Sequence, residues 1–182
     1  GTELTIHDID DPEQTLGPGP NNRGEVWISG PQVMKGYWHR EEETQQALPG
    51  GWLRTGDAGY MDEEGHFFLV DRLKDLILCS GYNVYPRNIE EAIYLHSSVA
   101  EVTVIGIADE YRGEAPKAFV KLKEDETLNE LDLIEFLADK LSKIEMPSII
   151  EFRSELPKTL IGKLSKKELV AEELAKIKDS NA

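Results

Sequence analysis

A short charged stretch divides the chain into two segments of different character. Residues 71–75 read DRLKD and lie between an alternating apolar run that ends at Val70 and a second apolar run that begins at Leu76. A buried strand does not continue through so many charges in so few residues. The sequence therefore predicts a break between two folding units here, with ligand-facing polar side chains on both sides of it.

The segment before the break is typical of β structure. Residues 3–9 and 25–29 alternate apolar and polar side chains, which predicts strands. Residues 58–61 and 66–70 form a hairpin over the turn DEEG at 62–65, where Gly65 takes a positive φ without steric cost. A short polar helix is expected over residues 40–48.

The register of this hairpin decides which side chains share a face. If Met61 faces His66, then Asp57 faces Val70, and Asp57 and Arg72 project from the same face near the same end. A shift of one residue would break this match, because successive side chains point to opposite faces of a strand.

The segment after the break mixes helices and strands. Its β-branched apolar runs predict strands, and its 3.6-residue apolar periods and cap signals predict helices. Strands are expected at 76–79, 99–107, 115–122 and 149–152, and helices at 87–96 after Pro86, at 127–142 from a capping box at Thr127 and Glu130, and at 165–178 from Ser165 and Glu168. The predicted fold is α+β, with a β-rich unit over residues 1–72 and a small sheet packed by helices over residues 73–182.

The composition excludes several classes of partner. The formal net charge is −15, which disfavours nucleic acid and anionic lipid as partners of the whole molecule. No apolar run is long enough to cross a bilayer, and no signal peptide opens the chain, so we expect a cytoplasmic protein, at most peripheral at a membrane. One segment is locally basic, through Lys158, Lys163, Lys166 and Lys167. It suits phosphate handling or, equally, a solvated helix entrance.

Cysteine and histidine usage argues against a metal centre. Cys79 is the single cysteine, which excludes an internal disulfide and a cysteine-based zinc site, and its apolar surroundings predict an inert buried thiol. The four histidines are scattered without ligand spacing. We therefore expect no metal site built from this chain's own residues.

Three side chains are candidates for chemistry. Asp57 follows a glycine at the start of the hairpin and could accept hydrogen bonds from a sugar diol, although an aspartate that merely stabilises a turn is commoner. Arg72 offers a planar five-donor fork beside the break, or a surface salt bridge to a neighbouring aspartate. Lys163 follows Gly162 on a loop and could neutralise charge that develops at a phosphate; alone, it reads as a solvated lysine.

Taken together, these motifs resemble the adenylate-forming superfamily, which includes acyl-CoA synthetases, aryl-CoA ligases, beetle luciferases and peptide-synthetase adenylation domains. The resemblance spans nearly the whole chain, and fatty acyl-CoA ligases are the most similar members. The matching runs, in family order, are GEVWISGPQVMKGYW at 24–38, GWLRTGD at 51–57, VDRLKDLI at 70–77, SGYNVYP at 80–86 and LPKTLIGK at 156–163.

The resemblance implies a role for each candidate. Asp57 and Arg72 match the residues that bind the ribose hydroxyls of ATP and AMP, and Lys163 matches the lysine that bridges carboxylate and α-phosphate during adenylation. Lys74 matches the hinge about which the small domain reorients between the half-reactions. The position that carries a second lysine in luciferases is Leu78 here, which argues against bioluminescence. Ser80 and Gly81 match the stretch that approaches the pantetheine of CoA.

The resemblance also implies what this chain lacks. The family's glycine-rich phosphate loop and its magnesium-holding acid lie upstream of the matching region, so the chain resembles the C-terminal third: the end of the large AMP-binding domain and the complete small domain. The opening at Gly1, directly into a strand, fits such a fragment. ATP, CoA and a fatty acid or other carboxylic acid are the expected ligands, with Mg²⁺ held by the missing part, and the fragment alone should be inactive.

Three functions stay open at this point. The leading one is an AMP-forming acid–thiol ligase that adenylates a fatty acid and transfers it to CoA. The second is an acyl-AMP ligase that loads a carrier protein in place of CoA; residues 83–86 (NVYP) favour CoA. The third is a binding or regulatory module without catalysis.

Overall fold

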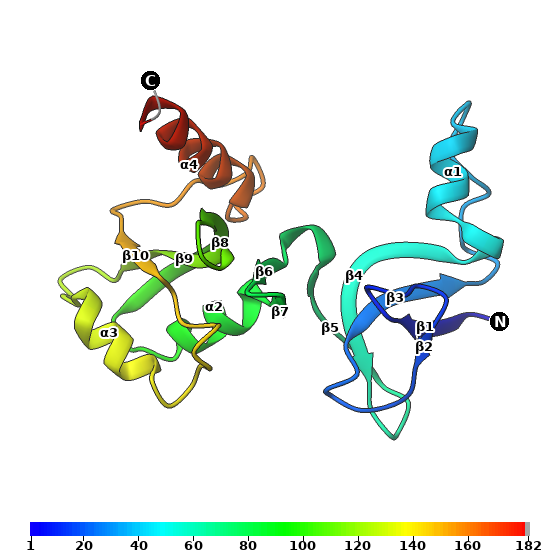
Figure 1. Cartoon of the computed structure of the whole chain (residues 1–182), viewed down its shortest axis with the longest axis horizontal. Helices are drawn as coiled ribbons and strands as arrows, with labels where there is room; N and C mark the ends of the chain where they lie inside the picture. Colours follow the sequence, from blue (N-terminus) through cyan, green and yellow to red (C-terminus); the bar gives the residue numbers. More distant parts are fainter. Residues whose placement is uncertain (181–182) are drawn as a thin grey trace. The chain divides into compact units, whose positions relative to one another are not determined.

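The computed structural model describes residues 1–180, and side chains to residue 177. The chain forms two compact units, Gly1–Lys74 and one that begins at Asp75 (Figure 1). The sequence analysis placed the boundary after Arg72, at the end of a strand; the structure instead divides the chain inside the short 3-10 helix η2 (Leu73–Asp75). The described helices include none that is both long and apolar enough to cross a membrane.

The first unit is an antiparallel sheet with one short helix, α1 (Glu41–Ala47), and a 3-10 turn, η1 (Pro49–Gly51). Its strands, in the order β2-β1-β3-β4-β5 across the sheet, are β2 (Thr15–Leu16), β1 (Glu3–His7), β3 (Gly24–Ser29), β4 (Leu53–Met61) and β5 (Phe67–Arg72). Buried apolar side chains from four of these strands form its core: Ile6, Val26, Trp27, Ala58 and Val70.

The β4–β5 hairpin corrects the predicted register. Met61 pairs with Phe67, not with His66, and a bulge at Val70 shifts the ladder once more, so that Asp57 pairs directly with Arg72. The predicted register was therefore wrong, because neither the turn's pairing nor the bulge is visible in the alternation of side chains. The consequence drawn from it is confirmed, since Asp57 and Arg72 lie side by side at one end of the hairpin.

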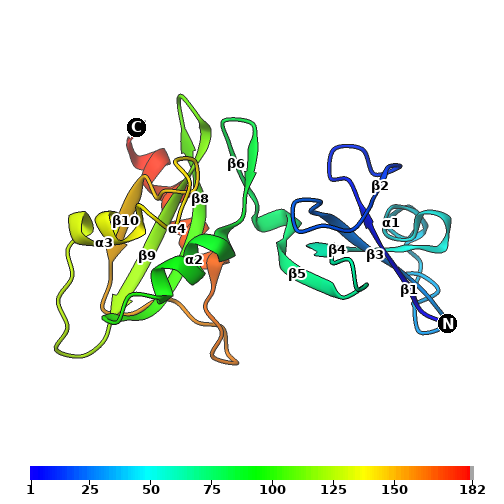
Figure 2. The ribbon, with the colours of Figure 1, turned by 90° about the horizontal axis from the view of Figure 1, so that it is seen from below.

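The second unit is a mixed sheet between helices, which confirms the predicted α+β class. Its strands are β6 (Ile77–Cys79), β7 (Tyr82–Val84), β8 (Val99–Asp109), β9 (Gly113–Leu122) and β10 (Ile149–Phe152). Strand β9 pairs with β8, β6 and β10, and of these pairings only the one with β10 is parallel. The helices are α2 (Pro86–Tyr94), α3 (Glu130–Leu137) and α4 (Lys166–Ser180) (Figure 2).

Alternation along β9 divides the core of this unit between the two faces of the sheet. Ala118 and Val120 pack in a cluster with α2 and α3, whereas Phe119 between them packs with Leu169 of α4. Helices α2 and α3 therefore cover one face and α4 covers the other. The lone thiol, Cys79, is fully buried in the first cluster, as the sequence predicted.

An ion-pair network fixes α4 on its face of the sheet. Lys117 of β9 is almost completely buried and lies 2.8 Å from a carboxylate oxygen of Glu151 and 2.9 Å from one of Glu173. Arg153 pairs with Glu151 at 2.7 Å and with Glu172 at 2.8 Å. Burial would raise the pKa of Glu151, but hydrogen bonds from Lys117 and Arg153 outweigh it and lower that pKa to about 2.

One helix begins at a different residue from the one predicted. The cap of α3 is Asn129, whose side chain accepts a hydrogen bond from the Asp132 backbone N–H at 2.9 Å, and not Thr127 with Glu130. The helix ends at Leu137, five residues before the predicted end at 142. The chain after it forms turns that still pack their apolar side chains on the core, so the periodic pattern continues beyond the helix.

Candidate functional site

The first candidate site is the Asp57–Arg72 pair at the end of the β4–β5 hairpin. Arg72 Nε lies 2.8 Å from Asp57 Oδ1, and the two side chains remain 58% and 23% exposed. The second oxygen of Asp57 and the remaining donors of Arg72 are therefore within reach of a ligand from solvent. The Asp57 carboxylate can accept hydrogen bonds from the hydroxyl groups of a vicinal diol, and the Arg72 guanidinium can donate to their oxygens.

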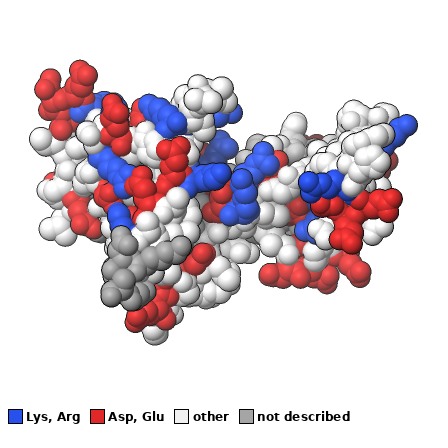
Figure 3. Space-filling view, turned by 90° about the horizontal axis from the view of Figure 1, so that it is seen from above, with Lys and Arg blue, Asp and Glu red and all other residues white. Residues whose placement is uncertain are grey.

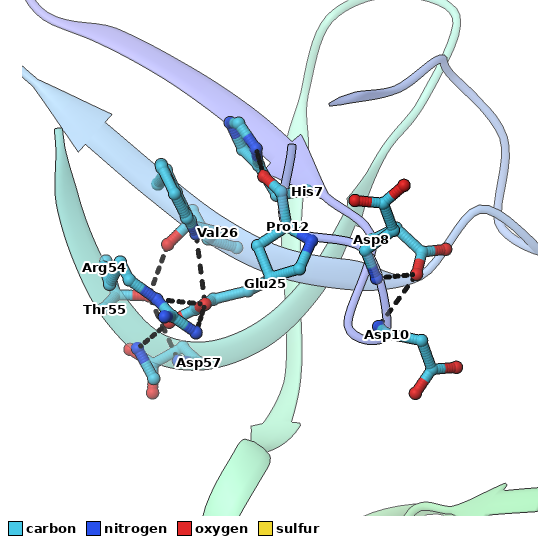
Figure 4. A network of polar contacts seen from close by, with 12 residues as sticks. His7, Asp8, Asp10, Pro12, Glu25, Val26, Arg54, Thr55 and Asp57 are labelled. Atoms are coloured by element: carbon cyan, nitrogen blue, oxygen red, sulfur yellow. Dashed lines mark hydrogen bonds and ion pairs between the residues drawn. The ribbon is translucent and has the colours of Figure 1, made fainter. Parts of the chain in front are cut away.

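A bulge in β4 presents Asp57. Glu25 pairs with Ala58 and Trp27 pairs with Arg54, so that the single residue Val26 of β3 lies opposite three residues of β4, 55–57. The extra residues leave the regular ladder and are held by side chains instead (Figure 4). The position of Asp57 thus depends on contacts outside the strand pairing.

A pocket of about 560 Å³ opens in the first unit beside this pair. Both arginines of this end of the sheet line it, together with Lys74 and side chains from α1 and the loop before it. Its walls are Glu25, Tyr37, Glu43, Gln46, Ala47, Arg54, Thr55, Gly56, Arg72, Leu73 and Lys74. Two of these cations already have acidic partners, since Arg54 pairs with Glu25 and Arg72 pairs with Asp57, so the opening carries mixed charge.

The second group of predicted residues lies in the second unit, at the β6–β7 turn. Ser80 and Gly81 both have positive φ, +52° and +81°, and form a tight turn whose tip is exposed. The Ser80 backbone N–H donates to the Arg112 carbonyl at 2.8 Å, which fixes the turn against the β8–β9 hairpin. The predicted hinge residue, Lys74, lies in η2 and ends the first unit.

Lys163 lies on a closed turn with anchored ends. The Thr159 N–H donates to the Lys163 carbonyl at 2.7 Å, and Lys163 N–H donates to Thr159 Oγ1 at 3.2 Å. Lys158 pairs with Glu101 at 2.6 Å on one side of the turn, and Lys166 pairs with Glu90 at 3.0 Å on the other. Lys163 itself is exposed, and its ammonium contacts no side chain in the part of the chain that the structure describes.

The charged side chains around this loop belong to a mixed surface. Figure 3 shows Lys and Arg interspersed with Asp and Glu over the face of the second unit in view. Of the four lysines that the sequence analysis grouped, two are held by acids, Lys158 by Glu101 and Lys166 by Glu90. The locally basic segment is thus partly neutralised by its own fold, and Lys163 is the exposed cation at its tip.

Comparison with known proteins connects these features. Residues 88–163 match the family described as the AMP-binding enzyme C-terminal domain. A long-chain-fatty-acid–CoA ligase of Bacillus subtilis is 50% identical over 154 residues, and one of Yersinia pestis is 46% identical over 173, which is 95% of this chain. The second unit of the chain belongs to the AMP-binding enzyme C-terminal domain family.

Solved structures of AMP-binding enzymes carry the same fold over both units. ATP-bound MatB of Rhodopseudomonas palustris superimposes with a TM-score of 0.87 at 32% identity, over 94% of this chain and 34% of that one. The o-succinylbenzoate CoA synthetase of Bacillus subtilis, in complex with its acyl-adenylate, gives a TM-score of 0.82 at 33% identity, over 92% and 33%. The chain spans about 30% of the length of the curated relatives, 28% and 30% for the two ligases above.

One cluster of the first unit was not expected from sequence. The hairpin turn gathers Asp62, Glu64 and His66, whose ligand atoms lie within 4.8 Å of one another, and His66 Nδ1 lies 3.1 Å from Asp62 Oδ2. The prediction of no metal site rested on the single cysteine and on the spacing of the histidines, which overlooks carboxylates. The cluster is exposed, and its internal hydrogen bonds account for its geometry.

Sequence reasoning also missed Glu25, the most buried acid of the first unit among the described residues, at 4% exposure. A glutamate next to a strand's apolar residues reads as a solvent-facing position. The signal that could have revealed it is Trp27, which lies on the same strand face and has an indole N–H that needs an acceptor when buried.

Proposed function

We propose that the chain is the C-terminal part of an ATP-dependent fatty acid–CoA ligase. The observation that carries the proposal is the Asp57–Arg72 pair, open to solvent, in a chain whose similarity to long-chain-fatty-acid–CoA ligases runs through both units. The reaction has two halves. A carboxylate oxygen attacks the α-phosphorus of ATP and expels pyrophosphate; the CoA thiolate then attacks the acyl carbon and expels AMP.

In this proposal Asp57 and Arg72 hold the ribose of the nucleotide. The Asp57 carboxylate accepts hydrogen bonds from the hydroxyl groups, and Arg72 donates to a hydroxyl oxygen while it keeps the Asp57 side chain oriented. Charge-assisted hydrogen bonds of this kind contribute about 1.5–3 kcal/mol each. They bind substrate and transition state alike, so they act on the KM for ATP more than on the maximal rate.

Lys163 supplies the cation for adenylation. Negative charge develops between the attacking carboxylate and the α-phosphate, and a positioned ammonium stabilises it by about 3–4 kcal/mol. The exposed position of Lys163, and its lack of a side-chain partner among the described residues, support this role because no internal ion pair has to be broken first. The anchoring pairs of Lys158 and Lys166 hold the turn on which Lys163 is presented.

Lys74 and the Ser80–Gly81 turn serve the change between the two half-reactions. Lys74 ends the first unit, and backbone rotation there would exchange Lys163 for the β6–β7 turn at the nucleotide. Ser80 and Gly81 would then lie along the pantetheine, where a turn tip with exposed backbone can accept a thiol-bearing chain closely. ATP, CoA and a fatty acid are thus the proposed ligands, and the substrates place the reaction in the cytoplasm.

Magnesium would be held by residues outside this chain. Among the described residues, the side chains that gather closely enough for a cation are the carboxylates of Asp62 and Glu64 and the imidazole of His66, at the far end of the hairpin from Asp57. They do not fit a site on the nucleotide's phosphates. The ion, when bound, neutralises phosphate charge, and this chain contributes Lys163 beside it.

The curated relatives named above are CoA ligases, which favours CoA over a carrier protein as the acyl acceptor. The test separates the two halves of the reaction in the full-length protein with its upstream region. Lys163→Ala should slow ATP–pyrophosphate exchange by about 10²–10³-fold and leave thioester formation from acyl-AMP and CoA unchanged. Lys167→Ala, an exposed lysine four residues away, is the matched control and should change neither. Exchange at the wild-type rate in Lys163→Ala would show that the lysine has been given the wrong role.

A further inference from the structure

The bulge that carries Asp57 lacks the hydrogen bonds of a regular strand pair. Residues 55–57 of β4 lie opposite the single residue Val26, so that β3 cannot provide backbone partners for all of them. Gly56, in the middle, has a φ of +70°, which turns its peptide out of the ladder. An amide N–H in this position needs another acceptor, because an unpaired backbone donor is costly once water is excluded.

The Glu25 carboxylate is that acceptor. Its Oε1 accepts the Gly56 backbone N–H at 3.0 Å. Its Oε2 accepts the Trp27 indole N–H at 3.1 Å and two donors of Arg54, Nε and Nη2, at 2.9 Å each. Both oxygens are thereby committed, in a side chain that is 5% exposed, and Figure 4 shows the carboxylate between β3 and the bulge.

Thr55 completes the frame on the other side of Gly56. Its hydroxyl donates to the Val26 carbonyl at 2.7 Å and accepts the Asp57 backbone N–H at 3.1 Å. The two peptide groups before Asp57 are thus both fixed by side chains. Glu25 accepts the Gly56 N–H and Thr55 accepts the Asp57 N–H, and the Asp57 side chain pairs with Arg72.

Placing a carboxylate here is expensive for the sheet. Burying the charge requires Arg54 as a counterion, and a buried ion pair adds little stability compared with apolar residues of similar volume. What Glu25 provides and an apolar side chain cannot is a fixed acceptor for Gly56, next to the functional aspartate. A buried carboxylate that adds little stability is therefore explained by a role in setting the position of Asp57.

We propose that Glu25 is a positioning residue for the nucleotide: it fixes the β4 bulge so that Asp57 meets the ribose hydroxyls. This inference rests on the proposed function, in which Asp57 binds ribose. Glu25 does not touch the nucleotide and acts only through the bulge. Loss of Glu25 therefore weakens the preference for a nucleotide with both ribose hydroxyls over one that lacks a hydroxyl. A role in stability alone would leave this preference unchanged.

The experiment compares ATP with 2′-deoxy-ATP in pyrophosphate exchange by the full-length enzyme. In the wild type, kcat/KM should favour ATP by about tenfold or more, the effect of one charge-assisted hydrogen bond. Glu25→Gln should reduce this preference to about twofold or less, since Gly56 and Arg54 donate to different carboxylate oxygens and the amide replaces one of these oxygens with a donor NH₂. The preference is a ratio measured on active enzyme only, so a variant that folds in lower yield still gives an interpretable result.

Two further variants sharpen the test. Glu25→Asp keeps the charge but shortens the reach to Gly56, and should lose the preference as Glu25→Gln does. Trp27→Phe removes only the indole donor to Oε2, leaves the Gly56 bond in place, and should keep the preference. Glu3→Gln, an exposed acid on β1, is the control for loss of negative charge.

The outcomes separate the two proposals. If Asp57→Ala loses the preference for ATP while both Glu25 variants keep it, the ribose site stands and the positioning role of Glu25 is wrong. If Asp57→Ala also keeps the preference, Asp57 does not bind the ribose and both proposals fail. If Glu25→Gln lowers the preference and has no further effect in the Asp57→Ala background, Glu25 acts through Asp57 as proposed.

Discussion

The two candidate sites are built in opposite ways. Asp57 in the first unit lies on a strand bulge held by Glu25 and Thr55, and is paired with Arg72 on the neighbouring strand. Lys163 in the second unit closes a turn with Thr159, with its ammonium exposed and ion pairs only at the ends of the loop. One site is fixed before a ligand arrives, and the other leaves its cation uncommitted.

This difference matches what each site is proposed to do. A group that binds the ribose throughout the reaction binds more tightly if it is held in place beforehand, because less conformational entropy is lost on binding. A group needed in only one half-reaction must be able to leave, and a permanent partner would oppose its arrival. The predictions below test this contrast, from the largest expected effect to the smallest.

The largest effects separate KM from kcat in adenylation. Asp57→Asn should raise the KM for ATP by about 10–100-fold with little change in kcat, because the interaction is present in ground and transition states. Lys163→Met should lower kcat by about 10²–10³-fold with the KM for ATP almost unchanged. Steady-state pyrophosphate exchange at varied ATP measures both, and equal effects on KM in the two variants would erase the contrast.

Acid should destabilise the second unit through the α4 network. The pKa of Glu151 is lowered to about 2 in the folded protein from 4.5, so its contribution to stability is present above pH 4.5 and is lost as pH falls toward 2. The pKa of Glu173 is lowered as well, since its hydrogen bonds from Lys176 and Lys117 outweigh the effect of burial. The urea midpoint should therefore fall as pH decreases through this window.

The matched variant is Glu151→Gln. It removes the titrating group, so its unfolding midpoint should start lower at neutral pH and depend less on pH between 4.5 and 2. Urea titrations followed by circular dichroism at several pH values measure the two slopes. Identical slopes for the wild type and Glu151→Gln would show that this carboxylate does not stabilise the fold.

The next effect concerns the loop that carries Lys163. Lys158→Ala removes the partner of Glu101, which is three-quarters buried and has a second oxygen without a hydrogen bond from any described residue. Stability should fall by about 1–3 kcal/mol, the cost of an unpaired buried acceptor. Glu101→Gln removes the negative charge and leaves Lys158 in place. This variant should therefore cost less stability than Lys158→Ala. A thermal melt that ranks the two variants in the other order would contradict this.

The smallest effects come from two glycines with positive φ. Gly56 has a φ of +70° and Gly162 of +78°, and a Cβ added at either would meet no described atom within 4 Å. Each change to alanine should thus cost only backbone strain, about 1–2 kcal/mol. Their kinetic effects should differ: Gly56→Ala should raise the KM for ATP, and Gly162→Ala should lower kcat for adenylation. The same kinetic signature in both would contradict the contrast.

Sequence alone predicted the elements that depend on period and on strong punctuation. Helix α2 follows from Pro86 and the apolar positions Ile89, Ala92 and Ile93, all of which are buried. The pairing of Asp57 with Arg72 on one face followed from two-residue alternation, although the register used to derive it was wrong. The predicted α+β class followed from the order of strands and helices in the second half of the chain.

The remaining features depend on geometry that a sequence pattern does not contain. The bulges at residues 55–57 and at Val70 add residues without a change in the apolar alternation, so neither could be placed in advance. The role of Glu25 follows from the first of these bulges, because its partner Gly56 lies 31 positions away in sequence. The roles of Ser80, Gly81, Lys74 and Lys163 stay predictions, since each depends on ligands.

Discrimination between ATP and 2′-deoxy-ATP in pyrophosphate exchange, measured for Asp57→Ala and Lys163→Ala in the full-length protein, tests this division of labour most directly. We predict that Asp57→Ala loses most of the preference for ATP. Lys163→Ala should slow exchange with ATP and with 2′-deoxy-ATP by the same factor, so that the preference for ATP is kept. A preference that survives in Asp57→Ala, or that disappears in Lys163→Ala, would contradict the assignment of the ribose to the first unit and of adenylation to the second.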